Sequence, residues 1–270
     1  MHHHSRLTAL ILSLPALATA ALPAPASAAP ARTAGPVAAP AAPAAPAAPA
    51  ASAPVTVARY TFDTGTVGGG KIADRSGRGS ALTVRRADGG SVHFNGTTSD
   101  KYAAFTAPCA ATARTCPRVL LEGTDDADLD PGTRLFRWGA TVRLTKAQVT
   151  DSSNVMQKGV ADTDSQWKMQ IGANQGKAQC VVIGTGSDKA VAHIVRSSVG
   201  IADNKWHDVM CQRSGANLTV YIDGTARGHV TIPATLSISN NLPLRIGGPN
   251  FHTRSDMFHG LLDDVWARVG

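Results

Sequence analysis

Two features are scarce in this 270-residue chain, long apolar runs and clustered basic residues, and each scarcity excludes a class of function. After the first 28 residues no segment approaches about 18 uninterrupted apolar residues, so we expect no membrane span in the mature chain. The formal net charge is +7, yet no basic run is longer than Arg85-Arg86. A nucleic-acid surface needs clustered basic residues with interleaved aromatics, so no nucleic-acid partner is expected. Diffuse charge of this kind serves solubility, or attracts acidic polysaccharides weakly.

The amino-terminal residues have the pattern of a secretory signal. Arg6 precedes an apolar run over residues 7–22, and the small residues Ala26-Ser27-Ala28 follow it. This pattern predicts a signal peptide over residues 1–28 and a secreted, extracellular protein. Residues 29–54 are almost wholly Ala and Pro, which predicts an extended, semi-rigid linker. One folded domain would then span residues 55–270.

The four cysteines fit export. An even number of cysteines in a secreted chain favours disulfides, and proximity in sequence pairs Cys109 with Cys116 and Cys180 with Cys211. The alternative, a zinc site, is disfavoured because no pair has CxxC spacing and no histidine is near the short loop in sequence.

The domain consists of short alternating segments separated by turn residues, with no sustained helical period. Leu218, Val220 and Ile222 alternate with Thr219 and Tyr221, and Asp223-Gly224 then predicts a hairpin turn. Many such segments predict an all-β antiparallel sandwich or barrel. The expected strands are residues 55–62, 91–94, 102–105, 136–144, 154–157, 167–171, 179–183, 190–195, 207–213, 218–222, 227–232, 244–246 and 261–269.

Several motifs in order resemble the laminin-G-like, concanavalin-A-like lectin/glucanase superfamily. They are Tyr60-Thr61-Phe62-Asp63, Asp74-Arg75-Ser76-Gly77-Arg78-Gly79, His93-Phe94-Asn95-Gly96, Met156-Gln157-Lys158-Gly159, Lys205-Trp206-His207-Asp208-Val209, Tyr221-Ile222-Asp223-Gly224 and Gly260-Leu261-Leu262-Asp263-Asp264-Val265. The resemblance covers nearly all of residues 55–270 and implies a jelly-roll β-sandwich. It also implies that His207 has a structural role.

The resemblance suggests two kinds of site. Glucanases of this superfamily use two glutamates on one strand, but this chain has only Glu122, so we expect no enzyme of that kind. No Gly-x-Ser-x-Gly motif occurs either. The resemblance implies a structural Ca²⁺ bound by Asp263 of the closing strand, with Asp63 and the turn at Gly96; the alternative is that these residues only shape turns. Asp162 or Asp164 could serve a second, rim position.

Few aromatic residues are available to contact a sugar ring. The four tryptophans fall in or at strands, where burial is the ordinary outcome. That leaves Tyr102, Tyr221, Phe251 and Phe258 as possible sugar platforms. The loop that contains Phe251, His252 and His259 either binds a ligand or covers the edge of the sandwich.

The sequence thus predicts a secreted, non-catalytic recognition module. An extracellular polysaccharide or glycan is the expected ligand class by resemblance. The alternatives are a protein-interaction or cell-envelope surface module that binds a surface protein, and an unrecognised glycan hydrolase or lyase.

Overall fold

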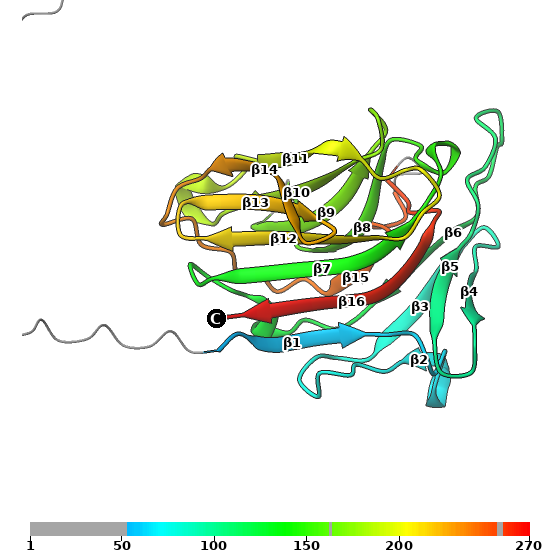
Figure 1. Ribbon diagram of the computed structural model, residues 1–270. Helices are drawn as coiled ribbons and strands as arrows, with labels where there is room; N and C mark the ends of the chain where they lie inside the picture. The colour runs from blue at the N-terminus through cyan, green and yellow to red at the C-terminus, as the bar shows by residue number, and fades with distance from the viewer. Residues whose placement is uncertain (1–52, 162–163, 253–255) are drawn as a thin grey trace, which may run out of the picture. The chain divides into compact units, whose positions relative to one another are not determined.

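Alternating apolar residues build two antiparallel sheets in the computed structural model of the chain (Figure 1). The structure describes residues 53–161, 164–252 and 256–270. Each sheet has eight strands, which confirms the predicted all-β jelly-roll sandwich. The predicted signal peptide and all but the last two residues of the predicted linker lie outside the described residues.

Sheet A has the strand order β14-β13-β12-β7-β16-β5-β4, and β1 pairs with β16 beside that path. Its strands are β1 (Val55–Tyr60), β4 (Val92–Gly96), β5 (Lys101–Phe105), β7 (Phe136–Arg143), β12 (His207–Ser214), β13 (Asn217–Ile222), β14 (Thr225–Thr231) and β16 (Leu261–Val269). The closing strand β16 therefore lies between the first strand and the centre of the sheet.

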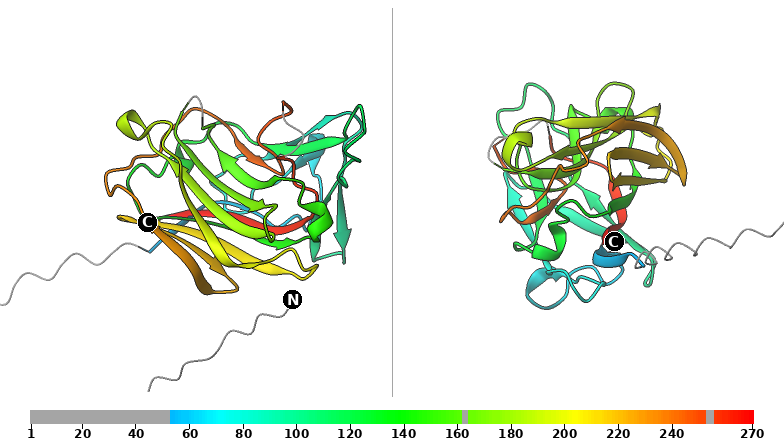
Figure 2. Two further views of the ribbon diagram at one scale, coloured as in Figure 1. Left: turned by 90° about the horizontal axis from the view of Figure 1, so that it is seen from above. Right: turned by 90° about the vertical axis from the view of Figure 1, so that its left-hand side faces the viewer.

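Sheet B has the order β11-β10-β9-β8-β15-β6-β3-β2 and packs against sheet A, as Figure 2 shows from two further sides. Its strands are β2 (Lys71–Ile72), β3 (Leu82–Ala87), β6 (Arg118–Glu122), β8 (Ser152–Lys158), β9 (Gln166–Gly172), β10 (Lys177–Ile183), β11 (His193–Gly200) and β15 (Leu244–Ile246). Short 3₁₀ turns, η1 (Gly68–Gly70), η2 (Ala127–Leu129), η3 (Lys146–Gln148) and η4 (Gly186–Asp188), complete the described elements.

Three strands of sheet B were not predicted. β3 was missed because Arg85 and Arg86 interrupt its apolar pattern, and β6 because Val119, Leu120 and Leu121 are all buried and do not alternate. β2 has only two residues. The strand predicted over residues 190–195 instead runs from His193 to Gly200, since Ala190 has a φ of +65° and belongs to a turn.

The core lies between the sheets. Phe136 and Trp138 of β7 stack with ring centroids 5.1 Å apart, and Trp167 of β9 packs against both from sheet B. The disulfide between Cys180 of β10 and Cys211 of β12 joins the two sheets. Both predicted cysteine pairs are present, and the other links Cys109 to Cys116 in the β5–β6 loop.

A buried lysine anchors two loops to sheet B. The ammonium of Lys158, fully buried at the end of β8, lies 2.8 Å from Asp130 and 3.1 Å from Asp125. It also donates to the backbone carbonyl of Asn240. Because a buried charge needs partners, this network ties the loop after β6 to the loop before β15.

Candidate functional site

The outer face of sheet A carries four aromatic side chains. Leu262, Val265 and Ala267 of β16 point into the core. The strand has a bulge between Asp263 and Trp266, and the side chains of Asp263 and Trp266 both point outward. Tyr102 and Tyr221 lie on the same side, because their strand neighbours Ala103 and Ile222 face inward, and Trp206, just before β12, contacts Tyr102. We call Tyr102, Trp206, Tyr221 and Trp266 the aromatic face.

Two of these residues were assigned differently from the sequence. Trp206 is 37% exposed and makes an edge contact with Tyr102 at 5.4 Å, and Trp266 is partly exposed, so the expectation of burial is wrong for both. It holds for Trp138 and Trp167, which are fully buried. The alternation of side chains along a strand could have predicted that Trp266 faces outward, because it lies between Val265 and Ala267, which face inward.

A hollow of about 260 Å³ lies in this face beside Trp266. Its lining combines aromatic, apolar and acidic groups from β7, β12, β13, β16 and the β13–β14 turn, namely Ala140, Thr141, Asp208, Val209, Met210, Tyr221, Gly224, Asp264 and Trp266. Aromatic surface beside a few convergent polar groups is the usual composition of a ligand site.

The acids of the hollow are held in place. The Thr141 hydroxyl donates to Asp208 at 2.7 Å, and the Arg59 guanidinium donates to Asp264 at 2.8 Å. Each of these bonds uses one carboxylate oxygen. Asp264 also has a φ of +41°, which is unusual for a residue with a side chain and marks the bulge that turns Trp266 outward.

The predicted calcium residues lie next to the aromatic face. The Asp63 carboxylate accepts from the backbone N–H of Lys101, which pairs with Gly96 across the β4–β5 hairpin. Asp263 is on the adjacent strand β16. Burial, together with the nearby carboxylates of Asp63, Asp264 and Asp100, raises the pKa of Asp263 to about 6. The structure therefore brings Asp63 and Asp263 into one electrostatic neighbourhood, with Gly96 on the hairpin beside Asp63.

These residues fit a calcium ion in kind. Carboxylate and backbone oxygens are the ligands that Ca²⁺ prefers. Within the described ranges, no group of three or more His, Cys, Asp or Glu side chains is placed to hold a metal ion. A Ca²⁺ held by Asp63 and Asp263 would therefore need carbonyls or waters to complete its shell.

The remaining predicted ligand residues lie elsewhere. Asp162 is outside the described residues. Asp164 accepts from the backbone N–H of Ser165 at 2.7 Å, which shapes the β8–β9 turn. The Phe251 carbonyl accepts from Arg118, whose guanidinium lies 5.9 Å from the Phe251 ring centroid, and the backbone N–H of His252 donates to Asn250.

Phe258 is not a platform. It is buried and packs edge-on against Phe105, with ring centroids 5.5 Å apart. His259, next to it, is also buried. Both residues pack at the edge of the sandwich.

The single glutamate lies on the other sheet. Glu122 is the last residue of β6, and its two carboxylate oxygens accept from Arg85 at 2.6 Å and Arg245 at 2.8 Å. This side chain is therefore fixed between two cations.

His207, the first residue of β12, lies between two aspartates and contacts both. Its Nδ1 lies 2.8 Å from Asp223 and its Nε2 3.1 Å from Asp203. Partial burial opposes the charged form, but the hydrogen bonds and charges of these two aspartates outweigh it and raise the pKa of His207. The clamp joins the β13–β14 turn to the loop that carries Trp206.

Solved structures with the same architecture include sugar-bound domains. Domain 4 of AbnA, a GH43 extracellular arabinanase from Geobacillus stearothermophilus in complex with arabinotriose, has a TM-score of 0.60 and 16% identity, over 80% of this chain and 93% of that one. The binding domain of Paraclostridial Mosquitocidal Protein 1 has a TM-score of 0.55 and 15% identity, over 78% and 48%. The binding domain of Botulinum Neurotoxin DC in complex with SialylT has a TM-score of 0.54 and 14% identity, over 79% and 47%.

At such identities the similarity shows a shared fold, and the chain spans about half the length of these toxin binding domains. No curated protein matches the chain in sequence. In the described part of the chain, no helix has the length and hydropathy needed to cross a bilayer. Residues 138–267 match the model of a family described as the concanavalin A-like lectin/glucanases superfamily. This match confirms, over residues 138–267, the resemblance to that superfamily that the motifs indicated.

Proposed function

We propose that this protein is a secreted, non-catalytic module that binds an extracellular carbohydrate on the aromatic face of sheet A. The observation that carries the proposal is the hollow in which Trp266 and Tyr221 lie beside Asp208 and Asp264. The apolar face of a sugar ring packs on an aromatic side chain, while carboxylates accept from its hydroxyls.

The platform is held rigidly before any ligand arrives. The Trp266 indole lies against Gly139 of β7, and the Arg268 guanidinium lies over the ring, 4.4 Å from its centroid. A sugar that stacks on Trp266 would therefore displace Arg268, which is exposed and can move aside, while the indole itself stays in place on the sheet.

The acids suit hydroxyl recognition better than proton transfer. Thr141 and Arg59 each occupy one oxygen of Asp208 and Asp264, respectively, and the second oxygens would accept from sugar hydroxyls. Glu122, the only glutamate, is neutralised by two arginines on the opposite sheet. These contacts support a role without catalysis.

The proposal includes a Ca²⁺ held by Asp63 and Asp263, with the hairpin at Gly96. The ion would neutralise a group of carboxylates that raise one another's pKa and would fix β16 beside the β4–β5 hairpin. Because β16 also carries Trp266, the metal would act on the sugar site by positioning that strand.

Other observations agree with this function. The neighbouring arabinanase domain is in complex with arabinotriose, and one neurotoxin binding domain is in complex with SialylT. Two disulfides favour an oxidising, extracellular location.

The test is a polysaccharide panel, applied to the full chain with its disulfides formed, in calcium and in chelator. We expect binding that Trp266→Ala and Tyr221→Ala weaken about tenfold or more, while Thr219→Ala, on the same strand as Tyr221, has no effect. Binding unchanged by both aromatic substitutions would place the site elsewhere. Absence of binding across the panel would overturn the proposal in favour of a surface-protein partner.

A further inference from the structure

Tyr102 and Trp206 form a second aromatic pair on the outer face of sheet A, outside the hollow at Trp266 and Tyr221. Neither Tyr102 nor Trp206 lines that hollow. Their rings make an edge contact with centroids 5.4 Å apart, and Trp206 is 37% exposed. Within the described residues, Trp206 is the one Phe, Tyr or Trp that is exposed rather than partly or fully buried. An exposed indole held by a neighbouring ring offers a second surface on which a sugar can stack.

The strand register sets the distance between the two aromatic pairs. Met210 of β12 pairs with Gly139 on one side and with Tyr221 on the other. The Trp266 indole lies over Gly139, so the hollow is level with Met210. Trp206 precedes Met210 by four residues, and four residues of extended strand span about 13 Å. The backbone positions of the two pairs are therefore separated along β12 by more than the width of one sugar ring.

A polar row crosses the sheet midway between the pairs. Asp208 lies two residues from Trp206 and two residues from Met210. It pairs with Thr141 of β7, which in turn pairs with Asp263 of β16. The Thr141 hydroxyl donates to one oxygen of Asp208 at 2.7 Å, so the second oxygen would accept from a hydroxyl. A sugar ring at this position would meet hydrogen-bonding groups between two aromatic surfaces.

The loop that carries Trp206 is tied to the end of β7 before any ligand binds. The backbone N–H of Asn204 donates to the Leu144 carbonyl at 2.9 Å, and the Arg143 guanidinium donates to the Asn204 side chain at 3.1 Å. On the other side of Trp206, His207 is held by its contacts with two aspartates. Because the backbone on both sides is fixed, binding at Trp206 costs little ordering of the loop.

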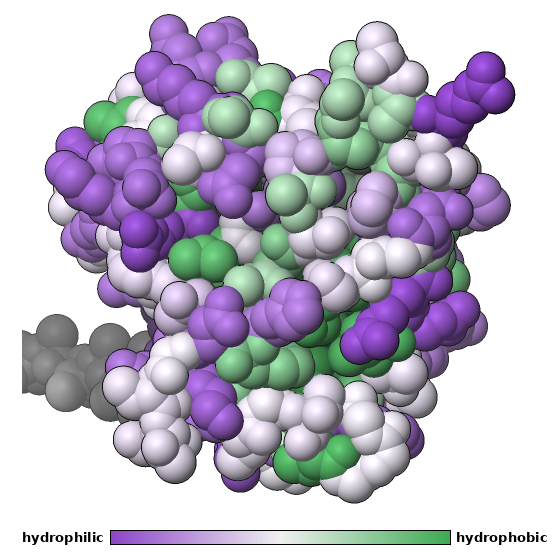
Figure 3. Space-filling model, turned by 90° about the vertical axis from the view of Figure 1, so that its right-hand side faces the viewer, coloured by the Kyte–Doolittle hydropathy of each residue, from purple (hydrophilic) through white to green (hydrophobic). Residues whose placement is uncertain are grey.

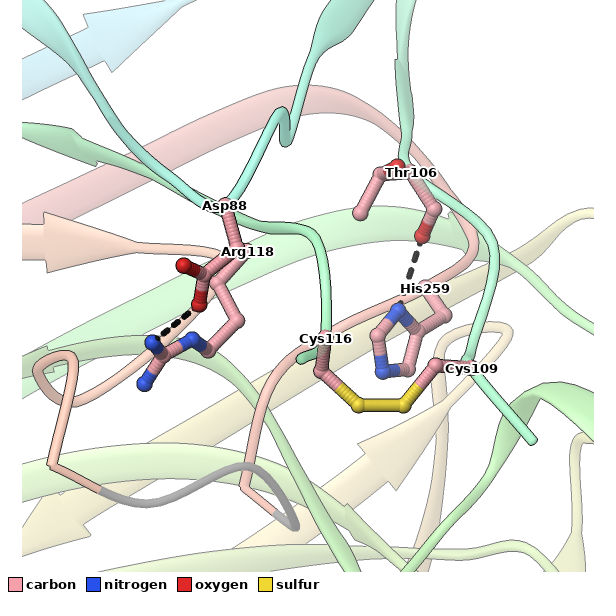
Figure 4. The surroundings of a disulfide bond; sticks show 6 residues. All are labelled: Asp88, Thr106, Cys109, Cys116, Arg118 and His259. Carbon is pink, nitrogen blue, oxygen red and sulfur yellow. Dashed lines mark hydrogen bonds and ion pairs between the residues drawn. A yellow bond between two sulfur atoms is a disulfide. The ribbon is translucent and has the colours of Figure 1, made fainter. Parts of the chain in front are cut away.

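A cavity elsewhere in the domain provides a control position. It has a volume of about 310 Å³ and lies beside the Cys109–Cys116 disulfide, with His259 in its lining. The end of the molecule that carries β4 and β5 shows hydrophobic residues in hollows, with hydrophilic residues around them (Figure 3). Figure 4 shows the Arg118 guanidinium of this lining turned toward Asp88, to which it donates, and away from His259. None of the lining residues belongs to the aromatic face.

We propose that the aromatic face binds a linear oligosaccharide of at least three units, with the sugar chain lying along β12. This inference rests on the proposed function and defines the form of its ligand. One ring stacks at Trp266 and Tyr221, and the next donates hydroxyl hydrogens to Asp208. The third ring stacks on Trp206 and Tyr102. A monosaccharide or disaccharide reaches only one of the two aromatic pairs, so the face selects longer chains over short sugars.

The experiment titrates the full chain, with its disulfides formed, with cello-, xylo-, arabino- and chito-oligosaccharides from disaccharide to hexasaccharide. In a series that binds, calorimetry should show affinity rising about tenfold from disaccharide to tetrasaccharide, the scale of one aromatic contact, and then levelling off. Trp206→Ala should remove this gain and leave the affinity for the disaccharide unchanged. Trp266→Ala should weaken the binding of every member of the series.

Two control variants test whether these effects are specific. Val199→Ala shortens a side chain that is also 37% exposed, on β11 of sheet B. Ala111→Leu partly fills the cavity beside the short disulfide. Both variants should bind each oligosaccharide as the parent protein does, and circular dichroism should show the same fold in all four.

This inference and the proposed function can fail separately. An affinity that does not depend on chain length, or a dependence that Trp206→Ala leaves intact, would overturn the inference, while weaker binding in Trp266→Ala would still support the proposed function. Binding of a polysaccharide from the panel without binding of any oligosaccharide would also overturn the inference alone. A panel without any binding would overturn both.

Discussion

The Trp266 indole lies directly over Gly139, so closely that a Cβ on residue 139 would come within 2.6 Å of the ring. Glycine at this position of β7 lets the indole pack down on the sheet and form one wall of the hollow. Both residues are on the outer face, which the core does not require to be apolar. Their contact connects a backbone property of β7 to the proposed sugar platform of β16.

Gly139→Ala should displace the indole without opening the core. We expect weaker polysaccharide binding, close to that of Trp266→Ala, and a shift in tryptophan fluorescence. The unfolding free energy should fall by only about 1 kcal/mol, since a surface side chain can move aside. A variant that binds as well as the parent protein would show that the position of the indole is unimportant for recognition.

The raised pKa of Asp263 predicts how the stability of the protein depends on pH and on calcium. Its folded pKa, about 6, is above the ordinary value for aspartate, so folding favours the protonated form. In chelator, this group's contribution to stability is therefore present at low pH and lost as pH rises through about 6.

Asp263→Asn removes that loss, so in chelator it should raise the melting temperature at pH 7 more than at pH 4. In calcium at pH 7 the parent protein should instead have the higher melting temperature, because ion binding stabilises the parent and not the variant. Thermal melts at both pH values, with and without Ca²⁺, measure this. A melting temperature of the parent protein that calcium leaves unchanged would contradict the metal site.

The raised pKa of His207 predicts a stability that also falls as pH rises, at higher pH than for Asp263 because histidine has the higher ordinary pKa. Its folded pKa is raised, so its bonds to Asp203 and Asp223 add stability that is present below the ordinary histidine pKa and lost as pH rises through the folded value. His207→Gln should lower the melting temperature at pH 5 more than at pH 9. Asp203→Asn should reproduce part of this difference, and an equal loss at both pH values would show that the histidine acts through shape alone.

Among the single substitutions considered, Lys158→Met should lower the unfolding free energy most. Lys158→Met leaves Asp130 without its buried cation and the Asn240 carbonyl without its donor. Removing one partner of a buried pair costs about 3–5 kcal/mol, which urea unfolding would measure. Lys205→Met is the matched control, since Lys205 is exposed and lies 3.9 Å from its acid. Similar losses for both variants would argue against the loop-anchoring role.

Removing the intersheet disulfide tests how the sandwich is held together. We expect the double substitution of Cys180 and Cys211 by alanine to lower the unfolding free energy by about 2–5 kcal/mol. Both cysteines are buried between the sheets, so the variant also loses packing. Mass mapping of a non-reduced digest should find Cys180 linked to Cys211, and a link to Cys109 would contradict the structure.

The sequence by itself determined the fold class, both cysteine pairs and the orientation of Tyr221, on the face opposite to Val220 and Ile222. The fold class follows from alternation along strands, from turns such as Asp223-Gly224 and from the order of short motifs, and the cysteine pairs follow from their even number and their proximity in sequence. Such rules failed at β6, where Leu120 faces outward but is buried with Met257 near Gly248. Alternation cannot show that a distant loop covers a face.

Only the tertiary structure decided which distant residues meet. It placed Trp266 over Gly139, Asp63 near Asp263, and His259 beside a disulfide that is far from it in sequence. Each contact depends on strand order and register across the sheets, and these are set by packing of the whole core. Spacing along the chain carries no information about them, because residues from opposite ends of the domain become neighbours only when the sandwich closes.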